Sequence, residues 1–354
     1  YAVDREDGGG MGFNVGSTWK PINMVAWMQK GHSINESLVT STVYDTSKFN
    51  CNGYGFVGPW RVQNSGGGTT SPESPLQGLI KSHNTTQASM ASNIGLCAIA
   101  DAAKEMGYHN AISNASDIYS ANSFQPPMTI GTVQASPLTM ANVYATMGAN
   151  GVECTPIAIT KVTDRSGSKV KVPSANCHQA IDPDIAQTVS YALNQGVVQP
   201  GGEASTTQLD NNRKTFAKTG TNENTVMTTA GFVPNQVAAF VAVADAQDPI
   251  NNTFDNKTIN GVYRPSWYGM YIATPAWKQF MNTYLAAINA PIDNDYGKGA
   301  DKYTVSKGAT RTYNQYQYQR QQNSQQQSQQ QTNQGQQQQS QQQPAEQQSD
   351  QQHQ

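Results

Sequence analysis

The chain has 354 residues, of which 36% are hydrophobic and 13% charged, and its formal net charge is −2. With so weak a charge and no block of basic residues, a nucleic-acid partner held through its phosphates is not expected. The longest purely apolar run, residues 237–244, is far shorter than the roughly 20 residues of a membrane span. Because Tyr1 is preceded by no initiator methionine or signal sequence, the chain reads as a fragment or a mature piece, and we expect membrane attachment only through a segment upstream.

The end of the chain differs in composition from the rest. From Tyr313 onward, 24 of 42 residues are Gln, which leaves too little apolar surface to offset the entropy of ordering the backbone. We therefore expect one folded region over residues 1–290, a linker over 291–312 and a disordered Gln-rich tail over 313–354.

Helix start and stop signals are clear along the folded region. A helix is predicted from Ser17 to Gly31, since glycine is a common C-terminal stop, and a second one over residues 84–106. Three more helices are expected where a proline follows a capping residue, at residues 136–137, 182–183 and 274–275.

Strand signals gather after the fourth helix. Residues 214–221, 230–233 and 237–243 are typical of consecutive antiparallel strands joined by short turns. Residues 50–71, rich in Gly, Asn and Ser, are expected to form a long surface loop. Helices followed by a strand cluster and a closing helix indicate an α+β fold, with an antiparallel sheet flanked by helices.

The four cysteines contain no C-x-x-C pair, and the histidines lack metal-ligand spacing, so we expect no metal and no cofactor. Cys154 and Cys177 flank a predicted hairpin whose strand pairing would bring them together. A bridge between them is one interpretation. A bridge between Cys51 and Cys97 is less favoured, and four buried thiols are the remaining possibility.

The first chemical motif is Ser17-Thr18-Trp19-Lys20, which places a hydroxyl and an amine on one helix face, about 5–6 Å apart at Cβ. A hydroxyl is a poor nucleophile unless a base takes its proton, and a lysine is such a base only when burial or a nearby cation lowers its pKa. Alone, the pattern is weak and is more typical of a helix cap followed by a solvated lysine. A second copy, Ser166 to Lys169, falls in the predicted hairpin turn and is interpreted as accidental.

Two further motifs carry hydroxyl, amide and amine groups. Lys218-Thr219-Gly220-Thr221 ends the first late strand, where a glycine often marks the close approach of a ligand, although a simple bulge is the alternative. Ser82-His83-Asn84 directly precedes a long helix. Ser-x-Asn also occurs at residues 33–35, 120–122 and 174–176, and we favour the copy that lies between the other two motifs.

In this order the three motifs are the signature of penicillin-binding proteins and class A β-lactamases. The chain resembles the transpeptidase domain of a penicillin-binding protein over about residues 11–290. Residues 230–234 and 275–281 add to the resemblance, which is greatest to bifunctional class A members, and the cysteines are similar to those of actinobacterial relatives. The resemblance implies a β-lactamase/transpeptidase-like fold that lacks N-terminal elements, so the central sheet is expected to have an unpaired edge.

The resemblance implies catalytic roles for the first two motifs. Ser17 would attack the penultimate D-Ala of a D-Ala-D-Ala stem peptide, and Lys20 would accept its proton. Ser82 would relay a proton to the leaving D-alanine, and Asn84 would bind the substrate amide and orient Lys20.

The third motif would hold the substrate. The resemblance implies that Lys218, Thr219 and Thr221 bind the terminal carboxylate and that Gly220 lets the peptide lie against the strand. The oxyanion hole would consist of the N–H groups of Ser17 and Thr221. The expected partners are peptidoglycan stem peptides and β-lactams, which would acylate the same serine, and the expected location is the cell-wall side of the plasma membrane.

Other functions share these motifs. A class A β-lactamase needs a water-activating carboxylate downstream of Ser-x-Asn, but Glu73 lies upstream, and Glu105 and Glu153 lack the usual Glu-x-x-Leu-Asn context. A D-alanyl-D-alanine carboxypeptidase would differ only in its acceptor. A non-catalytic penicillin-binding sensor or scaffold would keep the motifs without turnover.

Overall fold

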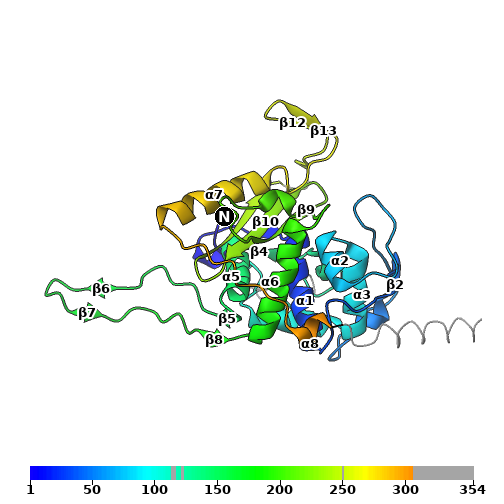
Figure 1. Ribbon diagram of the computed structural model, residues 1–354, viewed down its shortest axis with the longest axis horizontal. Coiled ribbons are helices and arrows are strands. Elements are labelled where there is room, and N and C mark those ends of the chain that lie inside the picture. Colours follow the sequence, from blue (N-terminus) through cyan, green and yellow to red (C-terminus); the bar gives the residue numbers. More distant parts are fainter. Residues whose placement is uncertain (113–116, 121–122, 249–250, 306–354) are drawn as a thin grey trace, which may run out of the picture. The chain divides into compact units, whose positions relative to one another are not determined.

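An antiparallel sheet of three strands lies at the centre of the fold, in the order β11-β10-β9 (Figure 1). The strands are β9 (Phe216–Asn222), β10 (Val226–Val233) and β11 (Val237–Val243). The register places Thr228 of β10 opposite Gly220 of β9. All three predicted strands are present, and β10 begins earlier than expected. Within the described residues β11 has no strand on its outer side, so the sheet has an open edge there.

The structure is a computed structural model that describes residues 1–112, 117–120, 123–248 and 251–305. All of them belong to one compact unit. The predicted Gln-rich tail, 313–354, lies outside the described residues. No helix among the described residues is long and apolar enough to cross a membrane.

Helices cover both faces of the sheet, which confirms the α+β class (Figure 1). On one face α5 (Pro137–Gly148) packs against β10 and β11, and α6 (Pro183–Val198) packs against β9. Phe216 and Phe232 stack there with ring centroids 5.1 Å apart. On the other face α7 (Ala273–Ala287) buries the completely enclosed Trp277 against the sheet.

Two of the three helices predicted from a capping residue followed by proline begin at the predicted residues, Pro137 and Pro183. The Ser136 hydroxyl accepts from Thr139 N at the start of α5, and the Asp182 carboxylate accepts from Asp184 N at the start of α6. The helix α7 begins at Ala273, earlier than expected. Its Thr274 hydroxyl is bonded to the Thr229 hydroxyl, 2.9 Å away, and does not cap the helix.

The predicted helix over residues 84–106 is wrong in one respect, because it is two helices. They are α3 (Asn84–Ile94) and α4 (Leu96–Glu105), separated by Gly95. Gly95 has a φ of 79°, which glycine adopts easily and which no helix can continue through. The chain therefore turns at Gly95.

The N-terminal helix is preceded by a short 3-10 turn. The turn η2 (Gly16–Trp19) leads into α1 (Lys20–Gln29), which ends before Gly31 as expected. The other short helices are η1 (Arg5–Asp7), η3 (Thr46–Phe49), α2 (Pro75–Ile80), η5 (Pro126–Ile130), η6 (Ser205–Thr207) and α8 (Asp301–Thr304).

Short ladders make up the remaining strands. They pair β1 (Phe13–Asn14) with β4 (Gln134–Ala135), β2 (Val43–Asp45) with β3 (Pro59–Arg61), β5 (Val152–Glu153) with β8 (His178–Gln179), β6 (Val162–Thr163) with β7 (Lys169–Val170), and β12 (Lys257–Ile259) with β13 (Val262–Arg264). Because β3 falls inside residues 50–71, the expected loop is partly ordered by pairing.

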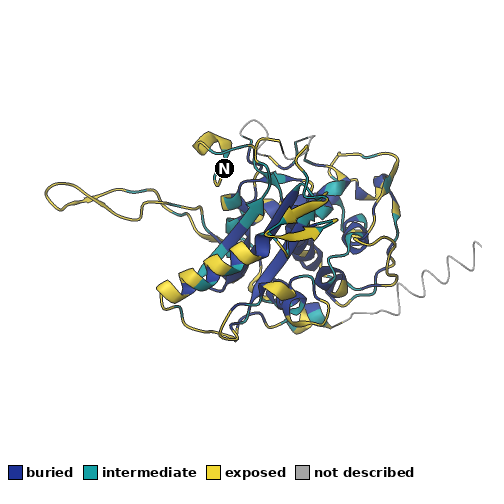
Figure 2. Cartoon of the chain, turned by 90° about the horizontal axis from the view of Figure 1, so that it is seen from above, coloured by how far each residue is buried: buried dark blue, intermediate teal, exposed yellow. Residues whose placement is uncertain are grey.

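Both possible disulfides are formed. Cys154–Cys177 closes the base of an exposed arm, residues 155–176, which carries β6 and β7 at its far end (Figures 1 and 2). Cys51–Cys97 ties the loop after η3 to the start of α4, with 5.8 Å between the Cα atoms. The prediction that favoured the Cys51–Cys97 bridge less was therefore wrong.

The described part of the expected linker, residues 291–305, packs against the folded unit. Tyr296 and Tyr303 are both buried there. The Tyr303 carbonyl accepts from Ile34 N at 2.8 Å and from the Ser33 hydroxyl at 2.8 Å. These two aromatic side chains anchor the segment that follows residue 290.

Candidate active site

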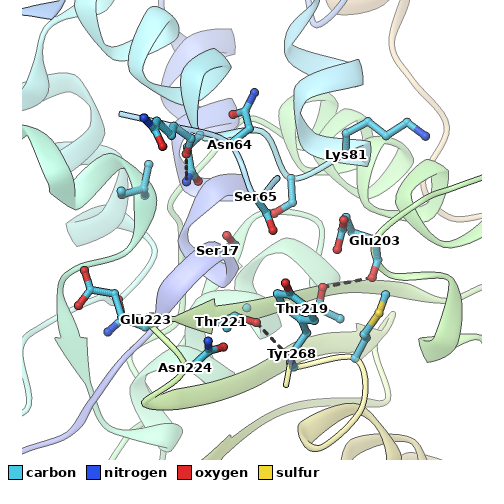
Figure 3. Close-up of a pocket in the computed structure, with 18 of the residues that line it drawn as sticks. Ser17, Asn64, Ser65, Lys81, Glu203, Thr219, Thr221, Glu223, Asn224 and Tyr268 are labelled. Carbon is cyan, nitrogen blue, oxygen red and sulfur yellow. Dashed lines mark hydrogen bonds between the residues drawn. The ribbon is translucent and has the colours of Figure 1, made fainter. Parts of the chain in front are cut away.

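A cleft of about 440 Å³ lies beside β9, and each of the three sequence motifs contributes to its wall. Ser17 comes from η2, Ser82 and Asn84 come from the start of α3 and the turn before it, and residues 219–221 come from β9. Figure 3 shows Ser17 between the segment that contains Ser65 and the strand that carries Thr221. The three motifs are thus brought together from positions as far apart as 200 residues.

Close packing with the sheet holds the turn that carries Ser17. The Val15 carbonyl accepts from the Thr18 hydroxyl at 2.6 Å and from the Thr228 hydroxyl of β10 at 3.0 Å. Gly16 has a φ of 56°, and an added Cβ at Gly131 would lie 1.8 Å from the Gly16 carbonyl oxygen. Only glycine fits at such contacts. Ser17 therefore lies on the cleft wall at a backbone position fixed from two sides.

Lys20 is completely buried behind the cleft and is held by the turn before α3. Its Nζ lies 2.6 Å from the Ser82 carbonyl oxygen, 2.7 Å from Asn84 Oδ1 and 3.2 Å from Ser82 Oγ. Burial lowers the pKa of Lys20 well below its usual value, the charge of Lys218 lowers it further, and Glu203 acts in the opposite direction.

Lys20 Nζ donates to three acceptors, the Ser82 carbonyl, Asn84 Oδ1 and the Ser82 hydroxyl. When the amine is neutral, which burial favours, a lone pair replaces one of these donors, and the rotatable Ser82 hydroxyl can turn its hydrogen toward it. A proton can therefore pass between Lys20 and Ser82. Within the described residues the Ser17 hydroxyl makes no hydrogen bond, so it is available to a ligand.

A buried carboxylate supports the turn that holds Lys20. His83, between Ser82 and Asn84, contacts Glu73 with its Nδ1, 2.8 Å from Oε1. Thr86 of α3 donates its hydroxyl to the same carboxylate. The Glu73 side chain is only 5% exposed. Sequence reasoning assigned Glu73 no role, because no local pattern connects it to a histidine ten positions later.

Both the oxygen and the nitrogen of the Asn84 side-chain amide make hydrogen bonds. Its Oδ1 accepts from Lys20, and its Nδ2 donates to the Gln63 carbonyl at 2.8 Å. An amide NH₂ carries two hydrogens, and among the described residues only the bond to Gln63 is made. One donor of Asn84 is therefore available at the cleft.

The β9 motif combines a buried amine with a close contact to the Ser17 turn. Lys218 is 2% exposed, does not line the cleft and donates to the Thr219 carbonyl at 2.9 Å. Burial lowers its pKa to about 8, although Glu203 raises it. An added Cβ at Gly220 would lie 3.2 Å from Ser17 N, so the backbones of β9 and η2 are adjacent there.

The two threonines of the motif lie on the cleft wall. The Thr219 hydroxyl donates to the Glu203 carbonyl at 3.2 Å. The Thr221 hydroxyl accepts from Gly269 N at 3.0 Å, so its own hydrogen can be given to a ligand. The wall thus offers hydroxyl groups from the same strand that carries the buried Lys218.

Several lining residues were not predicted from the sequence. They include Gln63, Asn64, Ser65, Glu203, Glu223, Tyr268, Gly269 and Met270. Figure 3 shows Glu203 and Glu223 at opposite ends of the cleft. None belongs to a motif. Of these residues, only Glu223 could have been expected near the cleft, because it follows the Lys-Thr-Gly-Thr motif by two residues.

The other copies of the short motifs lie elsewhere. Ser166 and Lys169 are exposed near the tip of the arm, and neither Ser33–Asn35 nor Ser174–Asn176 lines the cleft. The copy at 120–122 falls partly outside the described residues. Among the described residues no group of three or more His, Cys, Asp or Glu side chains is placed to hold a metal ion.

Comparisons with known proteins agree with this geometry. The family model described as "Penicillin binding protein transpeptidase domain" matches residues 12–279. Penicillin-binding protein 1A of Neisseria meningitidis serogroup A is 28% identical over 280 residues, which cover 76% of this chain and 31% of that protein. Penicillin-binding protein 1A of Mycolicibacterium smegmatis is 25% identical over 290 residues, which cover 77% of this chain and 34% of that protein. The chain thus spans about a third of the length of these relatives.

Solved structures share the fold. The penicillin-binding protein PonA1 from Mycobacterium tuberculosis superposes with a TM-score of 0.67 at 19% identity, over 84% of this chain and 75% of that one. Penicillin-binding protein 1A from Haemophilus influenzae gives a TM-score of 0.63 at 20% identity, over 80% of this chain and 43% of that one.

Proposed function

Because the chain belongs to the penicillin-binding protein transpeptidase family, we propose that it is a serine D,D-transpeptidase that cross-links peptidoglycan stem peptides. The observation that carries the proposal is Lys20, a buried amine with a strongly lowered pKa, one helical turn from a hydroxyl that lines a cleft. Such an amine can act as the base that a serine nucleophile requires. No cofactor takes part in this chemistry.

The first step is acylation of Ser17. Its oxygen attacks the carbonyl carbon of the penultimate D-Ala, and Lys20 accepts the hydroxyl proton. The developing oxyanion is stabilised by the N–H groups of Ser17 and Thr221. The close approach of Gly220 to the Ser17 backbone supports this pairing of donors.

The peptide C–N bond then breaks, and the leaving D-alanine takes a proton. Lys20 supplies that proton through Ser82, whose hydroxyl lies 3.2 Å from Nζ. The amine of a second stem peptide attacks the acyl ester and its proton passes to Lys20 by the same route. The ester C–O bond breaks, Lys20 returns the proton to the Ser17 oxygen, and the free hydroxyl is restored. Asn84 orients Lys20 with Oδ1 and binds the donor backbone with Nδ2.

The terminal carboxylate of the donor is held at β9. Lys218, buried behind the cleft wall, supplies positive charge from there, and Thr219 and Thr221 supply hydroxyl groups on the wall itself. The carboxylate of a β-lactam takes the same position, and its ring carbonyl acylates Ser17. Two disulfides favour an oxidising compartment, which supports a location on the cell-wall side of the plasma membrane.

A fluorescent penicillin tests the proposal. We expect a covalent adduct on Ser17, located by peptide mass spectrometry, that persists for many minutes, and no adduct in Ser17→Ala. An adduct lost within seconds would favour the β-lactamase. Release of D-alanine into water, with no cross-linked product when an amine acceptor is supplied, would favour the carboxypeptidase.

Complete lack of labelling would overturn the proposal in favour of a scaffold. A stable adduct in a protein that releases no D-alanine from any stem peptide would favour a sensor. As a control, Ser166→Ala removes the serine of the second Ser-x-x-Lys copy, which is exposed and remote from the cleft. It should be labelled as fast as the original chain.

The acylation rate should depend on pH through Lys218. Because its pKa is lowered to about 8, the ammonium is charged below that pH and progressively neutral above it, where the attraction for a carboxylate is lost. The second-order rate constant for acylation by benzylpenicillin, which reports groups of the free enzyme, should therefore fall above about pH 8. Benzylpenicillin methyl ester has no carboxylate and should show no such fall. An equal fall for the ester would contradict this role of Lys218.

A further inference from the structure

A carboxylate without a partner lies at one end of the cleft. Glu223 belongs to the turn between β9 and β10, and Figure 3 shows it on the opposite side of Ser17 from Glu203 and Lys81. Within the described residues it makes no hydrogen bond or ion pair, whereas the buried Glu73 has two partners. Glu223 is exposed, so it is a solvated carboxylate at the end of the cleft that no side chain among the described residues neutralises.

The backbone at Glu223 fixes where this carboxylate lies. Thr225 N donates to the Asn222 carbonyl at 2.8 Å, and the two residues between them, Glu223 and Asn224, have φ values of 44° and 53°. Asn or Gly is preferred at both central positions of such a turn. Glu is disfavoured there, so its presence beside the cleft is better explained by its charge than by the turn.

The surroundings of Glu223 favour a positive ligand. Among the described residues that line the cleft, Lys81 carries the one positive charge, and it donates to the carbonyls of Pro200 and Gly201 at the other end. The Asn224 side-chain amide donates to the Asp255 carboxylate, 2.5 Å away, and makes no hydrogen bond to Glu223. No cation of the cleft wall therefore competes for the carboxylate.

The distance along β9 indicates which part of a donor peptide reaches Glu223. This step rests on the proposed function, in which the terminal carboxylate lies beside Lys218 and Thr219. The rest of the peptide then runs along β9 toward Glu223, antiparallel to the strand. A strand advances about 3.3 Å per residue, so the third residue from the C-terminus lies roughly 7 Å from the terminal one, opposite Thr221. Glu223 follows two residues later, a gap of roughly 7 Å that a side chain as long as lysine spans.

We propose that Glu223 binds a side-chain ammonium group on the third residue from the donor's C-terminus. The cleft then prefers a donor whose amine is free over one whose amine has been acylated, because acylation removes the positive charge.

Three synthetic donors test this preference by competition with a fluorescent penicillin. They are N-acetylated tripeptides that end in D-Ala-D-Ala and begin with lysine, Nε-acetyl-lysine or norleucine. We expect the lysine peptide to halve the rate of Ser17 labelling at about one fifth of the concentration needed for the other two, as for a partly exposed ion pair. Raising the salt concentration should shrink this ratio.

Substitutions at position 223 test whether Glu223 causes the preference for the lysine peptide. In Glu223→Gln the three peptides should compete equally, and Glu223→Asp should recover part of the preference. Glu6→Gln removes an exposed carboxylate that does not line the cleft and should keep the fivefold ratio. If the three peptides compete equally in the original chain, if none competes, or if the preference survives in Glu223→Gln, the inference is wrong. Absence of labelling without any peptide would instead contradict the proposed function.

Discussion

Replacing Lys20 by alanine is expected to lower the rate of Ser17 acylation by penicillin about a thousandfold, within the range of general base catalysis. The amine lies one helical turn from Ser17, is buried, has a lowered pKa and is held by Ser82 and Asn84, which are the properties that a base for the Ser17 proton requires. The measurement is the second-order rate constant for labelling, followed by stopped-flow or by gel fluorescence.

The loss must be separated from misfolding. Lys20→Ala leaves the Ser82 carbonyl and Asn84 Oδ1 without their donor, which costs about 1–3 kcal/mol of stability, so labelling is measured well below the melting temperature given by circular dichroism. Lys30→Ala alters an exposed lysine that immediately follows the same helix and should leave the rate unchanged. Labelling of folded Lys20→Ala at the original rate would remove Lys20 from the base role.

Replacing Glu73 by alanine is expected to lower the free energy of unfolding by about 3 kcal/mol, because it leaves the partly buried His83 ring and the buried Thr86 hydroxyl without their acceptor. The acylation rate should also fall, by about tenfold or more, since His83 lies between the two residues that hold Lys20. Urea denaturation measures the first effect and penicillin labelling the second.

A similar pair on the surface serves as a control. His32 and Glu36 make the same kind of contact at 2.9 Å, but the histidine is 36% exposed and the pair is far from the cleft wall. Glu36→Ala should cost about 1 kcal/mol and leave acylation unchanged. Glu73→Gln keeps the shape of the side chain and should retain part of both properties. Equal effects at positions 73 and 36 would show that the buried pair has no special role.

The sequence was sufficient wherever a signal is local. The strands β9 and β11, the starts of α5 and α6 and the three motifs all follow from neighbouring residues, and their meeting at one cleft followed from the family resemblance. The signal failed where a single residue overrides a periodic pattern. Gly95 lies within an otherwise helical stretch, and its φ of 79° divides one predicted helix into two.

Contacts between distant residues could not be predicted in this way. Cys51 and Cys97 form a disulfide although 46 positions separate them. Glu73 is held by its bridge to Leu38 and from there contacts His83. Glu203 reaches the cleft through the loop after α6, and no spacing or composition marks it. Each of these depends on how separate elements pack, which is decided by the whole core.

The bridge between Cys154 and Cys177 also decides how the protein responds to cutting. The arm between them is exposed over most of its length and holds Lys161, Arg165 and Lys169, which are targets for trypsin-like proteases. A cut at any of them divides the polypeptide but leaves both pieces covalently joined at the root of the arm. The nucleophile lies on one piece and the β9 motif on the other, so a nicked molecule would keep its complete catalytic centre for as long as that sulfur link survives.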